Sequence, residues 1–498
     1  MNVNPITRLD YPDPDVIRVE DTYYMVSTTM HFMPGCEILQ SFDLVHWEHV
    51  TYVYETLDHT DAQQLKSGQN IYGQGMWAAS LRYHEGRFYI CFVANDTRKT
   101  YLYTSEKIDG PWKKQLIEGF YHDGSLLFDE DGRNYIVYGN DEIWITELNE
   151  DLTAPKKGGL HRLLVSDHKN PELGYEGSHI QKINGYYYIF LIHSLRDRWM
   201  RTEACFYSDS LEGEFTGGDV LCDDRGYCGQ GVAQGGIVDT PDGKWYAMLF
   251  QDSGAVGRIP ILLPVTWKDH FPVFGQNGHV PEEIEVHSTR PGYIYQPLVG
   301  SDDFCNGLLP RWQFNHDPDP RYYHLDALQG TYTITTREVC TELTQAVNTL
   351  TQRMSYPSCA AEVTVDASAL KEGDVAGLCA LQSCYAAVGI TKHHGKYEVL
   401  MLDKKEDGIL DMTEGTVVES HQMDFRLEAD FCNMKDEARC YYRVNKGAWL
   451  PIGTVHKLYF KLDHFTGCRF GLFCYAAEET GGSACFRDFK YYDVDEIS

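Results

Sequence analysis

The sequence predicts an all-β protein, a five-bladed β-propeller followed by an antiparallel β-sandwich. Five related segments recur at intervals of roughly 45 to 65 residues. In each segment a turn residue stands eight residues after the first position, shortly before an aromatic strand. Repeated hairpins at such intervals are typical of a propeller, in which the first strand of every blade lines a central axis. Beyond Ser301 the pattern changes to many period-two segments separated by Gly, Asn and Asp, which indicates a sandwich.

The five propeller segments begin at Asp13, Ala78, Asp123, Glu176 and Gln234, and their turn residues are Asp21, Gly86, Asp131, Asn184 and Asp242. The strands that follow read TYYMVS, RFYICF, NYIVYG, YYYIFL and WYAMLF, so we expect five β-hairpins. Three of the five first positions carry a carboxylate. If these positions are equivalent around the axis, the acids converge although they lie far apart in sequence. Converging acids beside polar and aromatic groups suggest acid-base chemistry on a neutral, hydroxyl-rich substrate.

The repeat pattern ends near Phe271, and a passage rich in Pro and Gly leads away from it. We therefore expect a propeller over residues 1–297 and a second domain over residues 301–498. Period-two segments in that domain run from GTYTITT to FRDFKYYDV, and the segment HKLYFKLD, residues 456–463, is predicted as one of its strands.

Composition limits the classes of partner. The 34 tyrosines and 13% aromatic content favour strands. A formal net charge of -30 argues against nucleic acid or an anionic membrane as partner, since each requires a basic face. The start, MNVNPITRLD, does not resemble a secretory signal, and no run of about 18 apolar residues could span a bilayer, so a cytoplasmic location is expected. The 15 cysteines fall mostly inside predicted strands, which indicates buried thiols and not a disulfide framework.

Four segments carry a family resemblance: PDPDVIRVEDTYYMVSTT, GMWAASLRYHEGRFYI, HDGSLLFDEDGRNYIV and YEGSHIQKINGYYYIF. Their order and spacing resemble glycoside hydrolase family 43, a family of inverting enzymes with a five-bladed propeller that acts on xylose- and arabinose-containing glycans. The tail from Ser301, with WQFNHDPD, is similar to the concanavalin-like or jelly-roll sandwich of the β-xylosidase and α-L-arabinofuranosidase branches. The resemblance covers nearly the whole chain.

The resemblance implies that Asp13 is the general base, Glu176 the general acid, and Asp123 the residue that tunes its partner and orients the substrate. Physical chemistry agrees, because hydrolysis with inversion needs one ionised carboxylate to deprotonate water and one protonated carboxyl to support the departing oxygen. A third negative charge nearby favours the protonated form of Glu176. The alternatives are a plain turn at Asp13, a solvated Glu176, and a surface pair of Asp123 with His122.

Substrate contacts are expected from four further residues. The indole of Trp77 would stack on the apolar face of a pentose, with core packing as the alternative. Arg258 resembles an arginine that binds sugar hydroxyls or orients an acid, with a surface ion pair as the alternative. His31 and Phe32, after the first hairpin strand, would wall the sugar site unless they pack in the core.

The chemistry requires no cofactor, and whether a metal is bound stays open. Relatives often hold a calcium ion in the channel near a histidine, where this chain has Gln234. Its amide oxygen is compatible with calcium, which prefers oxygen ligands.

The sequence thus predicts an exo-acting inverting glycosidase that releases terminal α-L-arabinofuranosyl or β-D-xylosyl residues from short oligosaccharides derived from xylan or arabinan. A non-catalytic glycan-binding propeller and an endo-arabinanase are the alternatives. The choice between the two pentoses, the oligomeric state and any contribution of the sandwich to the site stay open.

Overall fold

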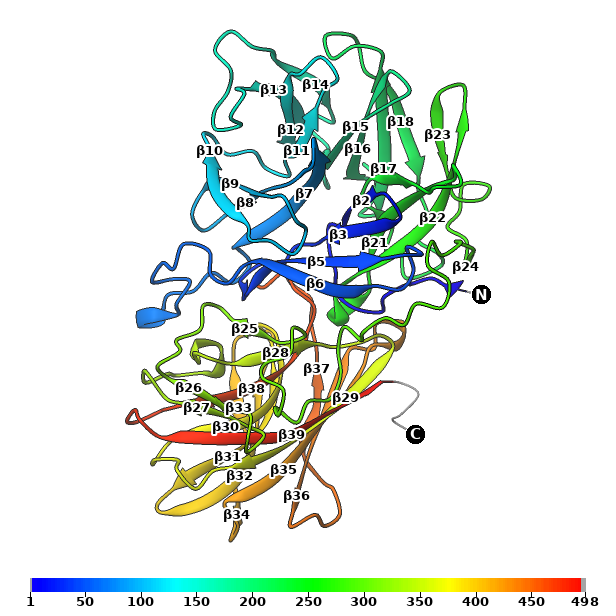
Figure 1. Cartoon of the computed structure of the whole chain (residues 1–498). Helices are drawn as coiled ribbons and strands as arrows, with labels where there is room; N and C mark the ends of the chain where they lie inside the picture. The colour runs from blue at the N-terminus through cyan, green and yellow to red at the C-terminus, as the bar shows by residue number, and fades with distance from the viewer. Residues whose placement is uncertain (1, 494–498) are drawn as a thin grey trace.

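Strands and loops make up almost the whole molecule. The computed structural model describes residues 2–493, and these contain no α-helix, only four 3₁₀ turns: η1 (Lys66–Gly68), η2 (Gly254–Val256), η3 (Leu343–Gln345) and η4 (Cys432–Met434). No helix among them is long and apolar enough to cross a membrane. Figure 1 shows two bodies, a ring of small sheets formed by the first part of the chain and a pair of larger sheets formed by the second part.

Five antiparallel sheets form the blades of the propeller, which confirms the predicted fold class. Blade one is β2 (Asp15–Val19), β3 (Thr22–Val26), β5 (Gly35–Ser41) and β6 (Glu48–Tyr54). Blade two is β7 (Met76–His84), β8 (Arg87–Ala94), β9 (Lys99–Ser105) and β10 (Lys113–Ile117). Blade three is β11 (Ser125–Phe128), β12 (Asn134–Asn140), β13 (Glu142–Leu148) and β14 (His161–Ser166). Blade four is β15 (Glu176–Ile183), β16 (Tyr186–Ser194), β17 (Arg201–Ser208) and β18 (Thr216–Leu221). Blade five is β19 (Val232–Ala233), β20 (Ile237–Asp239), β21 (Trp245–Asp252), β22 (Arg258–Lys268) and β23 (Phe271–Phe274).

All five predicted hairpins are present, pairing β2 with β3, β7 with β8, β11 with β12, β15 with β16, and β20 with β21. Local sequence explains the turns. The two residues between β15 and β16, Asn184 and Gly185, have φ of 52° and 85°, and the two between β7 and β8, Glu85 and Gly86, have 47° and 79°. Positive φ at both central residues matches the right-handed twist of the flanking strands.

The sandwich consists of two antiparallel sheets with a shared core. The first contains β33 (Leu410–Met412), β34 (Thr416–Val418), β32 (Lys396–Lys404), β31 (Ala386–His393), β30 (Val375–Leu381), β38 (Arg469–Tyr475), β28 (Leu350–Arg353), β25 (Gln313–Asn315) and β4 (Phe32–Met33). The second contains β26 (Tyr323–Asp326), β27 (Thr331–Thr335), β39 (Ser483–Asp493), β29 (Ser358–Asp366), β35 (Gln422–Asp430), β36 (Glu437–Val444) and β37 (Leu450–Lys457).

The strand predicted at residues 456–463 is wrong. Strand β37 ends at Lys457, and residues 458–467 form a loop. The alternating apolar residues of this loop face two environments: Leu458 is buried in the sandwich core, whereas Leu462 and Phe465 reach the propeller. Apolar residues that alternate because they contact two domains give the same sequence pattern as apolar residues that alternate along a β-strand.

Two strand pairings hold the first part of the chain, and one of them joins the two bodies. The two-residue strand β4 lies in the propeller half of the sequence but pairs with β25 at the edge of the first sandwich sheet. Strand β1 (Asn2–Val3) pairs with β24 (Glu283–Ile284), so the start of the chain is fixed to the segment that leaves blade five. From there the chain passes along blade one, where Thr289 donates its N–H to the carbonyl of Phe42, and enters the sandwich at Asp302.

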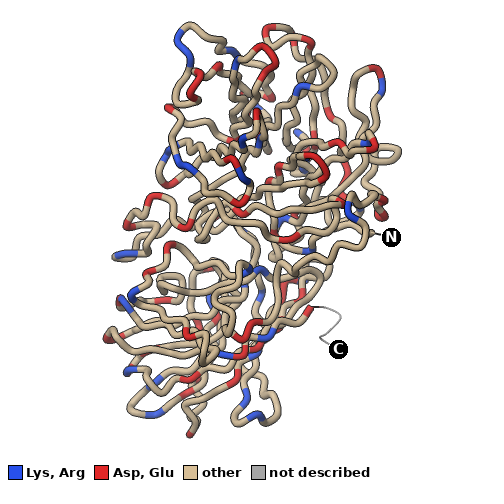
Figure 2. The backbone as a smooth tube through the Cα atoms, viewed as in Figure 1, with Lys and Arg blue, Asp and Glu red and all other residues tan. Residues whose placement is uncertain are grey.

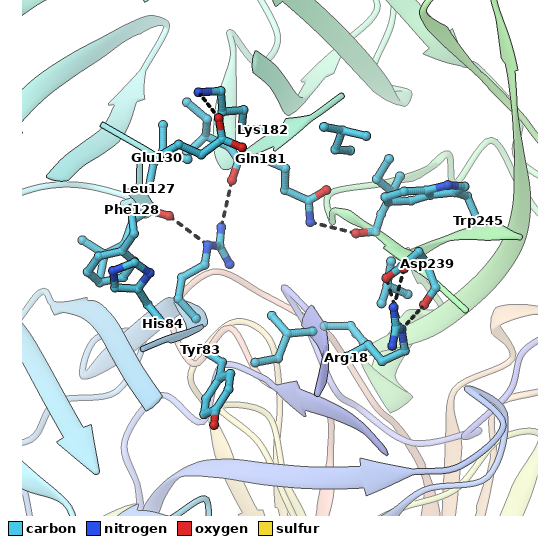
Figure 3. Close-up of a pocket in the computed structure, with 18 residues that line it drawn as sticks. Arg18, Tyr83, His84, Leu127, Phe128, Glu130, Gln181, Lys182, Asp239 and Trp245 are labelled. Atoms are coloured by element: carbon cyan, nitrogen blue, oxygen red, sulfur yellow. Dashed lines mark hydrogen bonds and ion pairs between the residues drawn. The ribbon is translucent and has the colours of Figure 1, made fainter. Parts of the chain in front are cut away.

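The innermost strands of the blades run side by side, so their starts meet at one end of the axis and their far ends at the other. At the far end lies a hollow of about 480 Å³, whose rim includes Trp245 and Phe128 (Figure 3). Between the two ends Arg82 crosses the channel, donating to Asp15, to Ser125 and to the carbonyl of Ile180. Acidic residues occur along the backbone of both bodies (Figure 2).

Candidate active site

The three repeated acids line one cavity, as the propeller symmetry predicts. It lies at the starts of the inner strands and measures about 290 Å³. Its wall is formed by Asp13, Trp77, His122, Asp123, Glu172, Leu173, Glu176, Trp199, Arg201, Gln234, Arg258, Leu462 and Phe465. The sequence predictions of Asp13, Asp123, Glu176, Trp77 and Arg258 therefore fall together in space.

A bend in the backbone lies just before the inner strand or within its first residues, at or next to the first position of each repeat. Four of these positions have positive φ: Asp13 at 52°, Ala78 at 21°, Asp123 at 48° and Gln234 at 61°. In the fourth repeat the bend falls one residue later, at Gly177 with φ 65°. Positive φ is uncommon for residues other than glycine and is concentrated at functional sites.

Asp13 is buried and accepts a hydrogen bond at each carboxylate oxygen. The Thr28 hydroxyl donates to Oδ2 at 2.6 Å, and Nη1 of Arg258 donates to Oδ1 at 3.1 Å. Arg258, only 2% exposed, also lies over the ring of Phe465 at 4.1 Å and donates to its carbonyl at 3.3 Å. One guanidinium thus fixes an acid of the propeller and a loop of the sandwich. A charge-assisted hydrogen bond of this kind can orient the Asp13 carboxylate.

Asp123 and Glu176 share a histidine. Nε2 of His122 lies 3.5 Å from Oδ2 of Asp123 and 3.6 Å from Oε2 of Glu176. The Gly177 N–H donates to Asp123 at 2.9 Å, and the Asn140 amide donates to Glu176 at 2.8 Å. Ligand-type atoms of His122, Asp123 and Glu176 all lie within 4.8 Å of one another, and Asp13 is not part of that group. The cavity therefore holds one acid apart from a close cluster of two.

Burial and charge act against each other in this cluster. Burial raises the pKa of Asp123 to about 6; His122 opposes the rise, and Glu176 and Asp13 add to it. The Asp123 carboxylate in turn raises the pKa of His122 to about 9, against the effect of burial. Between these values an imidazolium faces the Asp123 carboxylate, so the positive charge of His122 offsets the negative charge of Asp123.

Trp77 lies on the wall with its ring 5.6 Å from Phe465 and 6.1 Å from His122. His31 and Phe32 do not reach the cavity, which corrects the expectation that they wall the sugar site. They are 1% and 2% exposed. Phe32 forms part of β4 beneath the guanidinium of Arg469 at 3.5 Å, and His31 packs against His316 at 4.8 Å, so both fill the contact between propeller and sandwich.

Gln234 is on the cavity wall, where its backbone N–H donates to the buried carboxyl group of Glu203 at 2.7 Å. Its side chain packs closely against Gly177. The calcium ion considered at this position stays a prediction. The hydrolytic chemistry available to three carboxyl groups requires no cofactor.

Several wall residues were not identified from the sequence. Phe465 and Leu462 come from the sandwich loop, which the pattern predicted to be a strand. Trp199, Glu172 and Leu173 lie in irregular segments of blade four, where no periodic signal exists. His122 was considered only as a surface partner of Asp123, although its position directly before a repeated acid places it at the same axis.

Together, the propeller, the three axial acids and the aromatic wall define a glycosidase. A family model described as glycosyl hydrolases family 43 matches residues 3–272, and one described as the beta xylosidase C-terminal concanavalin A-like domain matches residues 301–492. The chain belongs to glycosyl hydrolases family 43.

Three relatives illustrate the match. A solved structure titled "Bifunctional GH43-CE" from Bacteroides eggerthii is 42% identical with a TM-score of 0.93; the match covers 100% of this chain but only 64% of that one. A "Beta-xylosidase" of Formosa agariphila is 26% identical over 99% of this chain and 89% of its own length. A "Non-reducing end alpha-L-arabinofuranosidase" of Bacteroides ovatus is 24% identical over 82% of this chain and 79% of its own.

Proposed function

We propose that the chain is an exo-acting inverting glycosidase that removes terminal α-L-arabinofuranosyl or β-D-xylosyl residues from oligosaccharides derived from xylan or arabinan. The observation that carries the proposal is the single cavity in which Asp13, Asp123 and Glu176 meet. The names of the relatives, a beta-xylosidase and a non-reducing-end arabinofuranosidase, support the two pentoses.

In this mechanism Asp13 deprotonates water and Glu176 protonates the departing oxygen. Arg258 and Thr28 hold both oxygens of Asp13 in place. Asp123 and His122 hold Glu176 from the other side of the cluster. Inversion requires room for a water molecule between base and acid, and a base that stands apart from the Asp123–Glu176 cluster is consistent with that requirement.

The exo mode rests on the loop at residues 458–467. Phe465 and Leu462 from this loop form part of the wall, so the sandwich closes one side of the cavity. A polymer bound along its length would need that side open. The closed side favours an exo enzyme over an endo-arabinanase.

The test is turnover of nitrophenyl α-L-arabinofuranoside and nitrophenyl β-D-xyloside by the full chain. We expect release of nitrophenol from at least one of them, and a loss of roughly 10³-fold or more in kcat for Glu176→Gln on a natural oligosaccharide and for Asp13→Asn on both substrate types. NMR of the first sugar formed should show the inverted anomer. Binding of these glycosides without release of nitrophenol would instead support a glycan-binding propeller, and net retention would contradict the role of Asp13.

A further inference from the structure

The outer end of the cavity carries apolar side chains that the proposed chemistry does not use. Trp199 is 45% exposed and Leu462 is 75% exposed, yet both belong to the cavity wall. The catalytic groups lie deeper, with Asp13 at 7% and Asp123 at 6% exposed. An exposed indole and an exposed leucine on the wall of one sugar site offer apolar surface for a second ring.

Trp199 is held in a fixed position at this mouth. The short loop between β16 and β17 is closed by hydrogen bonds: the Leu195 N–H donates to the Met200 carbonyl at 3.1 Å, and the Met200 N–H donates to the Ser194 hydroxyl at 2.8 Å. Behind the indole, the guanidinium of Arg201 lies 5.2 Å from its ring and is fixed by Asp252 at 2.7 Å. A preorganised ring loses little entropy on binding a ligand.

The place of Trp199 in the same blade as Glu176 indicates which sugar ring of the substrate it would contact. Trp199 and Arg201 belong to blade four, the blade whose inner strand begins with Glu176. Glu172 and Leu173, on the same wall, precede Glu176 in the chain, and the Leu173 carbonyl accepts the Ser194 N–H at 3.0 Å, which ties the two segments together. The general acid must stand on the side of the leaving group. The outer wall beside Glu176 is therefore where the departing sugar lies.

We propose that Trp199, together with Leu462 of the sandwich, forms the binding site for the leaving-group sugar, and that this site takes a pyranose ring stacked on the indole. The inference rests on the proposed function and adds to it the part of the substrate beyond the scissile bond. It makes the sandwich a contributor to substrate choice through Leu462.

The decisive comparison uses two substrates of the same pentose, an oligosaccharide such as xylobiose and the corresponding glycosyl fluoride, whose leaving group is too small to reach Trp199. Trp199→Ala should lower kcat/KM for the oligosaccharide by about tenfold and leave the fluoride unchanged, and Trp199→Phe should retain most of the activity. Leu462→Ala should have the same selectivity with a smaller effect. Trp245→Ala, at the opposite end of the propeller axis, is the matched control and should change neither rate (Figure 3).

Equal losses on both substrates, or no loss on either, would overturn the inference. A second measurement separates it from the proposed function: calorimetric titration of xylobiose onto Glu176→Gln protein, with and without Trp199→Ala. Weaker binding in the double variant supports the leaving-group site, and equal binding refutes it, whatever the turnover of the wild-type chain.

Discussion

At the scale of single residues, two basic side chains offset the charge of acids that share one small cavity. Asp13 is neutralised by Arg258, and Asp123 faces His122, so neither acid relies on solvent. Removing a cation from such a pair leaves a buried charge without compensation, and this is why the two basic residues matter as much as the acids they face.

His122 should set the acidic side of the pH profile. Because the imidazolium opposes the rise in the pKa of Asp123, whose value is about 6, His122→Asn should raise that pKa further. The fall in kcat/KM on the acidic side should then begin at a higher pH, by about one unit or more. The measurement is kcat/KM from pH 4 to 9 with a chromogenic pentoside. His84→Asn serves as the control, because the His84 ring stacks on Phe128 at the other end of the axis. An unchanged acidic side of the pH profile in the His122 variant would show that His122 does not influence the pKa that governs activity.

The carboxylates could be predicted from the sequence because the repeat specifies where they meet. Asp13, Asp123 and Glu176 occupy equivalent positions of a periodic pattern, so symmetry alone brings them together. Trp199 and Glu172 carry no such pattern, since they lie in irregular segments whose path depends on hydrogen bonds between loops. His31 and Phe32 follow a propeller strand in sequence, but a strand contributed by the other domain determines where they pack.

At the scale of elements, the hairpins follow from local chemistry and the loop at 458–467 does not. Turn residues with positive φ and alternating strands specify each hairpin within about a dozen residues. The loop is instead fixed from outside: Asp10 accepts the Gly467 N–H at 2.8 Å, and the ring of Tyr72 stacks on His464 at 3.9 Å. Contacts between residues so far apart in the chain leave no pattern in the local sequence.

The ring of Phe465 should contribute to turnover through the wall it completes. Phe465→Ala removes the face that lies over Arg258 but keeps the backbone carbonyl that accepts its hydrogen bond. We expect kcat/KM to fall about tenfold on aryl pentosides, since a partly desolvated cation–π contact amounts to about 1–2 kcal/mol. Val455→Ala, on the neighbouring strand β37, should have no effect. Steady-state kinetics on aryl pentosides would measure kcat/KM for both variants. An unchanged kcat/KM in the Phe465 variant would mean that the loop does not shape the site.

At the scale of the whole molecule, propeller and sandwich share buried ionic contacts. Arg353 of β28 enters the propeller, where it pairs with Glu37 at 2.9 Å, donates to the Asp10 carbonyl and lies over the ring of Tyr11 at 4.0 Å. Glu37 is 2% exposed and Arg353 is 4% exposed. Burial by itself raises the pKa of Glu37, but Arg353 and His49 outweigh it and bring that pKa below its ordinary value.

Arg353→Met should therefore lower the free energy of unfolding by about 3–5 kcal/mol, because it leaves the Glu37 carboxylate buried without its cation. In the wild-type protein the stability contributed by Glu37 is present above its unfolded pKa and is lost as the pH falls through the folded value, so the loss caused by the variant should shrink in acid. Urea unfolding at pH 7 and pH 4 measures both effects. Arg321→Met, at a side chain 74% exposed, should leave the unfolding curve unchanged. A variant as stable as the wild type would show that the contact between the bodies contributes little.

The guanidinium of Arg82 spans the channel beneath the cavity, bound at once to blades one, three and four. A sugar leaving the cavity along the axis would have to break these hydrogen bonds, whereas the entrance offers a path past the exposed Trp199 and Leu462. Release through the entrance alone would order the two products, with the shortened oligosaccharide leaving first and the monosaccharide behind it leaving last.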